Sequence, residues 1–219
     1  MRTEMRSFFR KLIPWHETVS PTRIVSLGFL TVIVLGALLL CLPISTRSGT
    51  PAPLLTALFT STSAVCVTGL VLQDTMTYWS TFGQVVIMLL IQVGGLGFMS
   101  IACIFSFLLR RTIGLQQRLV MMQSLNLNDI AGVVRLMRHI IIWTLMAEGT
   151  GAMILSIRFS QDFGIQKGIF KGIFHAVSAF CNAGFDLMGE QTPFISLSNY
   201  SGDLTVNLVI MCLIVLGGL

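Results

Sequence analysis

Four stretches of this chain are long, apolar and almost free of charge. They cover residues 24–42, 82–109, 140–157 and 204–219, and Glu148 is the one charged residue within them. An α-helix needs about 20 apolar residues to cross the roughly 30 Å hydrocarbon core of a bilayer. Charged residues make up only 11% of the chain, against about 25% in soluble domains. The sequence therefore predicts an all-α integral membrane protein. Because the last stretch is still apolar at Leu219, we expect the natural protein to continue.

The basic residues form two dense groups that decide the expected topology. One group precedes the first apolar stretch, and the other lies within 110–138. The positive-inside rule places both groups in the cytoplasm, which requires an even number of crossings between them. The Thr-, Ser- and Gly-rich segment between Arg47 and Asp74 would make that number odd if it crossed. We therefore expect it to enter from outside as a short helix, turn near Gly69 and leave on the same side, and 167–185 to do the same.

The two dipping segments are copies of one another. Residues 63–70 and 178–185 share Ser, Ala, Cys and Gly at a constant offset of 115. Further on, 85–96 and 208–219 are identical at eight of twelve positions, at an offset of 123. A unit of span, short dipping helix, glycine-containing turn and second span therefore occurs twice.

Such a unit is typical of a cation pore. Irregular backbone at membrane depth is tolerated only where it is buried in protein or lines a water-filled cavity. Several units around one axis would let each turn face a shared polar centre, as in K⁺ channels, where carbonyl oxygens replace the hydration shell of the ion. Glycine permits positive φ at the turn, and the carboxyl ends of the short helices favour cations. The alternative is a generic transporter with glycine-rich helix packing and no filter.

The residues around both turns resemble a known family. One part of the chain is similar to the first pore repeat of the Trk/Ktr/HKT potassium transporter superfamily. It comprises residues 60–70 (TSTSAVCVTGL), Asp74-Thr75, and 82–84 (FGQ), which open a span that contains 94–97 (GGLG). Residues 174–185 (FHAVSAFCNAGF) resemble the second pore helix and filter of the same superfamily. The resemblance runs from about Pro14 to the last residue. It is nearest to the Ktr membrane subunit (KtrB-like), because a short basic arm leads straight into the first span.

The resemblance implies potassium uptake across the cell membrane through a pseudo-fourfold pore. A complete subunit would contain four repeats with one filter glycine each, and this chain would supply the first two, with Gly69 and Gly184. K⁺ is the implied transported ion, Na⁺ an optional coupling ion, and no covalent cofactor is expected. The implied partners are the remaining repeats, a second subunit in a homodimer, a cytosolic nucleotide-binding gating ring of the KtrA/TrkA type and membrane lipid, with no nucleic acid. The amino terminus is expected in the cytoplasm.

This interpretation divides the chain into a cytoplasmic basic arm (1–20), a first repeat (21–110), a cytoplasmic connection (111–138) and a second repeat truncated in its last span (139–219). The arm and the connection would face the ring. The candidate potassium ligands are the backbone carbonyl oxygens of ten filter residues: Val65, Cys66, Val67, Thr68, Gly69, Phe180, Cys181, Asn182, Ala183 and Gly184.

Several side chains have an expected role beside the filter. Cys66 and Cys181 are expected to be small fillers behind it, and Thr68 and Asn182 either tune it or make supporting hydrogen bonds. Five acidic residues are expected on the outer face, as solvated loop residues or, alternatively, as attractors of cations. They are Asp74, Asp162, Asp186, Glu190 and Asp203.

Two polar residues at membrane depth are given structural roles. Glu148 is expected to accept hydrogen bonds from a pore-helix end or from Thr144, and His175 to be a satisfied packing residue. Two other functions remain as alternatives. One is a nonconducting half-pore that regulates complete subunits. The other is an intramembrane enzyme using Glu148, His139 and His175, which no catalytic motif supports, so we expect no enzyme.

Overall fold

The computed structural model describes residues 21–97 and 133–218, and this part of the chain is helical and contains no strand. The predicted all-α class is confirmed. The first repeat contains α2 (Pro21–Leu40), the short helix η1 (Pro43–Ser45), α3 (Leu54–Val65), α4 (Thr75–Tyr78) and α5 (Thr81–Leu96). The second repeat contains α8 (Val133–Phe163), α9 (Ile165–Phe180), the short helix η2 (Ser196–Tyr200) and α10 (Leu204–Gly218).

Local sequence explains where the helices of the first repeat begin and end. Pro53 directly precedes α3 and cannot donate to a preceding turn. The Ser80 side chain caps α5 by accepting a hydrogen bond of 3.2 Å from the N–H of Gly83. At the other end, Gly97 has a φ of 78°, a conformation that glycine adopts without steric cost. The apolar segment is thereby cut into a defined 16-residue helix.

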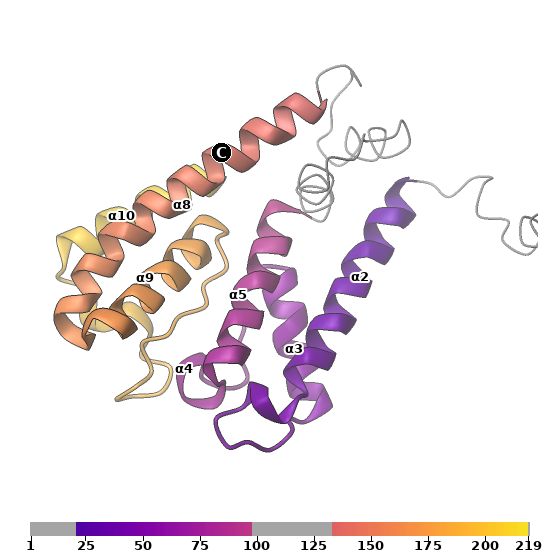
Figure 1. The fold of residues 1–219 in the computed structure, drawn as a ribbon, viewed down its shortest axis with the longest axis horizontal. Helices are drawn as coiled ribbons and strands as arrows, with labels where there is room; N and C mark the ends of the chain where they lie inside the picture. The colour runs from indigo at the N-terminus through magenta and orange to yellow at the C-terminus, as the bar shows by residue number, and fades with distance from the viewer. Residues whose placement is uncertain (1–20, 98–132, 219) are drawn as a thin grey trace, which may run out of the picture.

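The two repeats lie side by side, and in each the middle helix, α3 or α9, packs against the helices before and after it (Figure 1). α3 packs on α2 and α5, α9 packs on α8 and α10, and α5 contacts α9 across the boundary. One cluster of buried apolar side chains crosses that boundary, because it joins Leu40 and Ile87 of the first repeat to Phe174 and Leu187 of the second. The repeats therefore share a core.

α3 and α9 lie at the two segments that are expected to dip into the membrane. α3 has 12 residues and α9 has 16, so at 1.5 Å per residue they extend about 18 and 24 Å, less than a bilayer core. The first helix of the second repeat begins at Val133, inside the segment assigned to the cytoplasmic connection. The basic arm, the distal part of the expected span 82–109 and most of the connection lie outside the described residues.

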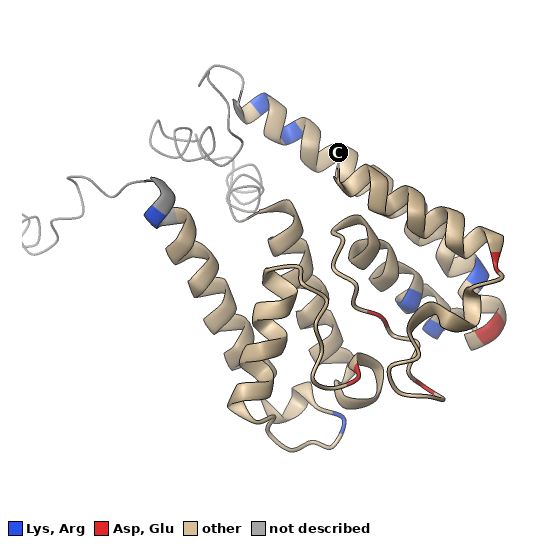
Figure 2. Ribbon diagram, turned by 180° about the vertical axis from the view of Figure 1, so that it is seen from behind, with Lys and Arg blue, Asp and Glu red and all other residues tan. Residues whose placement is uncertain are grey.

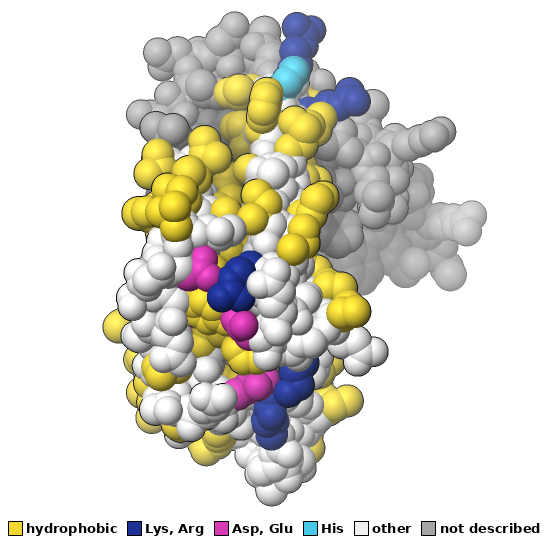
Figure 3. All heavy atoms as spheres, turned by 90° about the vertical axis from the view of Figure 1, so that its left-hand side faces the viewer, with side chains coloured by type: hydrophobic (Ala, Val, Ile, Leu, Met, Phe, Trp, Pro, Cys, Tyr) yellow, Lys and Arg dark blue, Asp and Glu magenta, His cyan; other side chains and the backbone are white. Residues whose placement is uncertain are grey.

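Charge and apolar surface are separated along the molecule. Within the described ranges one helix, Val134–Phe163, is long and apolar enough to cross a membrane, and four shorter helices are apolar. The basic residues in the first turns of α2 and α8 lie at one end of the ribbon, and acidic residues gather toward the other (Figure 2). On the face made by α8 and α10, apolar side chains form a band between two charged zones (Figure 3). Trp143 and Met153 of α8 and Met211 of α10 are more than half exposed.

Candidate ion-binding site

The two candidate filter loops leave the carboxyl ends of α3 and α9 in the same way. In the first repeat, the N–H of Thr68 donates to the carbonyl of Ser63 at 3.0 Å. In the second, the N–H of Ala183 donates to the carbonyl of Ser178 at 2.7 Å. Donor and acceptor recur at the sequence offset of 115, so the internal repeat extends to the hydrogen bonds of the loops.

The loops also share an unusual backbone conformation. Val67 and Gly69 have φ values of 55° and 72°, and their counterparts Asn182 and Gly184 have 56° and 70°. The residue between each pair has no positive φ. The alternating sign of φ distinguishes both loops from an ordinary extended chain, in which successive carbonyl groups point to opposite sides.

Val67 makes this conformation costly. Positive φ is a genuine outlier for a β-branched residue, and a residue held in such a region costs about 1–3 kcal/mol unless the surroundings enforce it. Side-chain hydrogen bonds brace both loops. The hydroxyl groups of Ser63 and Thr68 lie 2.9 Å apart, and the Asn182 amide donates to the carbonyl of Ile214 at 3.4 Å. Of the two roles expected for Thr68 and Asn182, the structure shows supporting hydrogen bonds.

Glycines of the flanking helices let the ends of the short helices approach closely. A Cβ added to Gly94 of α5 would collide with the carbonyl oxygen of Val65. A Cβ added to Gly217 of α10 would collide with the carbonyl oxygen of Phe180. These are equivalent contacts in the two repeats, so the first carbonyl of each candidate set packs against a flanking helix. Gly94 and Gly217 thus allow close helix packing.

The two loops meet each other. A Cβ added to Gly69 would lie 2.7 Å from the carbonyl oxygen of Ala183, and one added to Gly184 would lie 3.6 Å from the Cα of Gly69. The first repeat also touches the second loop through α5, because a Cβ on Gly95 would lie 2.6 Å from the Cβ of Cys181. Of the predicted site residues, the structure thus brings the two filter glycines together.

Glu148 forms a polar contact behind the second loop. Its carboxylate is buried and accepts hydrogen bonds of 3.0 and 3.1 Å from the Gln92 amide of α5. The thiol of Cys181, the capping residue of α9, lies 4.0 Å from the same carboxylate. The expected structural role and the expected contact with a short-helix end are confirmed. The principal donor, Gln92, was not predicted from the sequence.

Two cysteines with equivalent sequence positions differ in burial. Cys181 is buried because α5 lies against it, whereas Cys66 is exposed. The filler role expected for Cys66 is therefore wrong for the described chain. The packing role expected for His175 is confirmed, since Nδ1 bonds the carbonyl of Lys171 at 2.7 Å and Nε2 accepts from the N–H of Leu187 at 3.3 Å.

Asp74 is not the solvated loop residue that the sequence suggested. Its side chain is buried, and its Oδ1 caps α4 by accepting from the N–H of Thr77 at 2.8 Å. Its Oδ2 accepts from the N–H of Phe194 at 2.8 Å. This carboxylate joins the chain that follows the first loop to the chain that follows the second. Its local signal was the position just before a Thr-rich turn, which is typical of a helix N-cap.

Lys171 and Glu190 are a further pair that sequence reasoning missed. The ammonium of Lys171 lies 3.6 Å from the Glu190 carboxylate and is almost fully buried. The available signal was a charged residue in the middle of a helix expected to dip into the membrane, because such residues at membrane depth are functional hypotheses.

The all-α fold with its two joined loops matches a family of cation transport proteins. Residues 11–219 match the TrkH family model, described as a cation transport protein. The chain belongs to this family, which confirms the resemblance to the Trk/Ktr potassium transporters. The family is one of transporters, so the expectation that the chain is no enzyme is confirmed.

Individual relatives support the Ktr branch. The chain is 44% identical over 209 residues to Ktr system potassium uptake protein B of Bacillus subtilis, covering 95% of this chain and 45% of the relative. It is 43% identical over 204 residues to the potassium/sodium uptake protein NtpJ of Enterococcus hirae, covering 93% and 44%. The protein B of Vibrio alginolyticus is 35% identical over 197 residues, covering 90% and 42%. The chain thus spans less than half the length of these relatives.

Proposed function

We propose that this chain forms two of the four repeats of a potassium uptake pore. The observation that carries the proposal is the contact between two loops of identical conformation, made where Gly69 faces the carbonyl of Ala183. Loops that share one conformation and meet at their glycines can be arranged around one axis, and two further repeats would complete a ring of carbonyl groups.

The ligands in this proposal are main-chain oxygens of Cys66–Gly69 and Cys181–Gly184, because the carbonyl groups of Val65 and Phe180 pack against Gly94 and Gly217. Carbonyl groups replace the hydration shell of K⁺ without introducing a full charge, so the ion binds and still leaves. The carboxyl ends of α3 and α9 lie directly before these residues, and their partial negative charge favours a cation over an anion. No catalytic side chain takes part.

The membrane arrangement follows from the distribution of charge and apolar surface. The exposed apolar residues of α2, α8 and α10 would face lipid, and the outer loops around Asp74 and Glu190 would face the outside of the cell. The basic first turns of α2 and α8 would then lie at the cytoplasmic side. This assigns the arm and the connection to the surface where a nucleotide-binding gating ring would dock. A second subunit would complete a homodimer, and Na⁺ would be a coupling ion.

The experiment uses a complete subunit, made by joining this chain to the part of the Bacillus subtilis relative that it does not match. It is produced, with the partner protein of that relative, in a bacterium that lacks its own potassium uptake systems. We expect growth at low external K⁺ and Rb⁺ influx that K⁺ inhibits much better than Na⁺. A subunit that is present in the membrane at normal amounts but takes up no Rb⁺ would contradict the proposal and favour the nonconducting alternative.

A further inference from the structure

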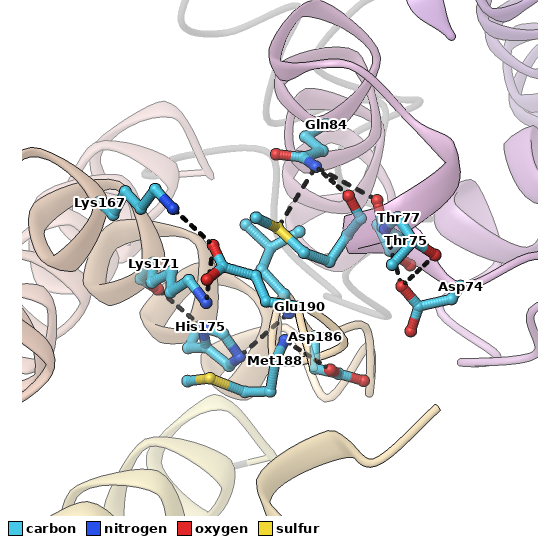
Figure 4. Close-up of polar contacts among 12 residues, drawn as sticks. Asp74, Thr75, Thr77, Gln84, Lys167, Lys171, His175, Asp186, Met188 and Glu190 are labelled. Atoms are coloured by element: carbon cyan, nitrogen blue, oxygen red, sulfur yellow. Dashed lines mark hydrogen bonds and ion pairs between the residues drawn. The ribbon is translucent and has the colours of Figure 1, made fainter. Parts of the chain in front are cut away.

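A row of polar side chains on α9 faces the chain that leaves the second filter loop. Lys171, His175 and Ser178 are four and three residues apart, a spacing that puts them on one face of the helix. The chain running away from the filter, residues 185–190, passes along this face. Figure 4 shows Lys171 and His175 pointing toward it from α9.

Each member of the row holds a different point of that segment. The Ser178 hydroxyl donates to the carbonyl of Phe185 at 2.6 Å, directly after the filter glycine. His175 accepts the N–H of Leu187 through Nε2 at 3.3 Å. The ammonium of Lys171 lies 3.6 Å from Glu190 Oε1. Successive turns of α9 are thus fastened to successive parts of the outgoing chain.

These contacts are buried, which makes them sensitive to change. Lys171, His175 and Ser178 are only 1–3% exposed. The Lys171 ammonium lies 3.6 Å from the ring centroid of Phe163, and among the described residues its Nζ has no hydrogen-bond partner. A buried charge costs free energy unless a partner compensates it. Glu190 is therefore held in place because its carboxylate compensates the buried charge of Lys171.

The first repeat lacks this row. At the offset of 115, Lys171 and His175 correspond to Thr56 and Thr60, which carry no charge or ring. Ser63, the counterpart of Ser178, lies 2.9 Å from the Thr68 hydroxyl within the loop. Within the described residues, only in the second of the two repeats is the outgoing chain held against the preceding helix by a charged side chain, Lys171, and an imidazole, His175.

We infer that Lys171, His175 and Ser178 are positioning residues that fix the outgoing chain of the second loop and thereby help to set ion selectivity. This inference rests on the proposed function of the loops. Discrimination between K⁺ and Na⁺ depends on the size of the carbonyl cage or on the field of its oxygens. Either quantity changes when the chain directly after Gly184 becomes free to move.

The test compares K⁺ and Na⁺ uptake by variants of the complete subunit defined above. Lys171→Met removes the charge at similar length, Glu190→Gln removes its partner, and Ser178→Ala deletes a single oxygen. Each is expected to lower the ratio of K⁺ to Na⁺ uptake about three- to tenfold, the range expected for one lost interaction. Lys171→Met with Glu190→Gln is expected to be no worse than the worse single variant, because both remove the same contact.

The matched control is Lys167→Met. Lys167 also lies 3.3 Å from Glu190 Oε1, but its side chain is 62% exposed, and exposed ion pairs contribute little. It is expected to keep the normal uptake ratio. An additive double variant would indicate general damage and would overturn the inference. Ser178→Ala decides the result if Lys171→Met fails to reach the membrane.

The two proposals fail in different ways. If the unchanged subunit takes up K⁺ with no preference over Na⁺, the proposed function itself is wrong. If the unchanged subunit discriminates, and Ser178→Ala, Lys171→Met and Glu190→Gln discriminate equally well at normal membrane amounts, only the positioning role is overturned.

Discussion

The carboxylate of Asp74 accepts a hydrogen bond of 2.8 Å from the backbone N–H of Phe194, which lies 120 residues further along the chain. The same carboxylate caps α4, and Gly189 packs directly against it. One buried side chain therefore joins the segment that follows the first filter loop to the segment that follows the second. Because Gly189 has no side chain, it leaves room for the carboxylate of Asp74. A residue of the second repeat thus accommodates a side chain of the first.

Replacement of Asp74 should loosen the contact between the repeats. Asp74→Ala leaves the N–H groups of Thr77 and Phe194 without their acceptor, and a buried unsatisfied group costs about 1–3 kcal/mol. We expect a clear fall in the melting temperature of the purified complete subunit. Asp74→Asn keeps one carbonyl acceptor, so its melting temperature should fall less. Equal melting temperatures for Asp74→Ala and the unchanged protein would show that the contact contributes nothing.

The pair Gln92 and Glu148 should behave as a unit. Gln92→Leu removes the donor and leaves a buried carboxylate behind, and breaking a buried polar pair by removing one partner is strongly destabilising. The double variant Gln92→Leu with Glu148→Leu removes both groups and should be more stable than Gln92→Leu alone. The measurement is a double-mutant cycle of thermal stability in detergent. A double variant less stable than either single one would argue against the pairing.

Gly95 should not accept a side chain. A Cβ at this position would meet Cys181, directly beneath the second filter loop, so Gly95→Ala is expected to lower both stability and K⁺ uptake. The control is Gly149→Ala on α8, where a Cβ would have no neighbour within 4 Å. That change should be neutral or stabilising by up to about 1 kcal/mol through helix propensity. Similar behaviour of the two variants would mean that the close approach of α5 to the second loop is unimportant.

If α3 dips into the membrane as proposed, the chain before and after it is reached from the same side. Ser48 precedes α3, Gln73 follows the first loop, and both are exposed. Cysteines placed singly at these positions should both react with a membrane-impermeant maleimide added outside intact cells. Labelling of Ser48→Cys from outside and of Gln73→Cys only after the cells are opened would mean that α3 crosses the membrane.

Local and repeated features could be predicted from the sequence. Gly69 and Gly184 predicted two turns, and the internal repeat predicted that these turns share a structure. Both predictions were possible because a pattern within a few residues determines backbone conformation. Capping and packing within one repeat follow from the same kind of pattern. These features place α3, α9 and both candidate loops.

Contacts between the repeats could not be predicted in this way. Gln92 and Glu148 are 56 residues apart, and each lies at a position whose counterpart in the other repeat is apolar, namely Val215 and Ile33. Internal symmetry therefore gives no hint of their pairing. The burial of Asp74 likewise depends on how the two repeats pack, because its partner Phe194 lies in the second repeat. Cys66 shows the converse, since it occupies the same position of the repeat as Cys181 but is exposed where Cys181 is buried.

The most direct test of the pore compares two glycines with the same backbone conformation. Gly69 and Gly49 have φ values of 72° and 71°, but a Cβ at Gly69 would lie 2.7 Å from the carbonyl oxygen of Ala183, whereas one at Gly49 would meet nothing within 4 Å. The ratio of K⁺ to Na⁺ uptake is measured for Gly69→Ser and Gly49→Ser in the complete subunit. The account predicts at least a tenfold lower ratio for Gly69→Ser, about 1.4 kcal/mol or more, with normal membrane amounts, and an unchanged ratio for Gly49→Ser. An unchanged ratio for Gly69→Ser would contradict it.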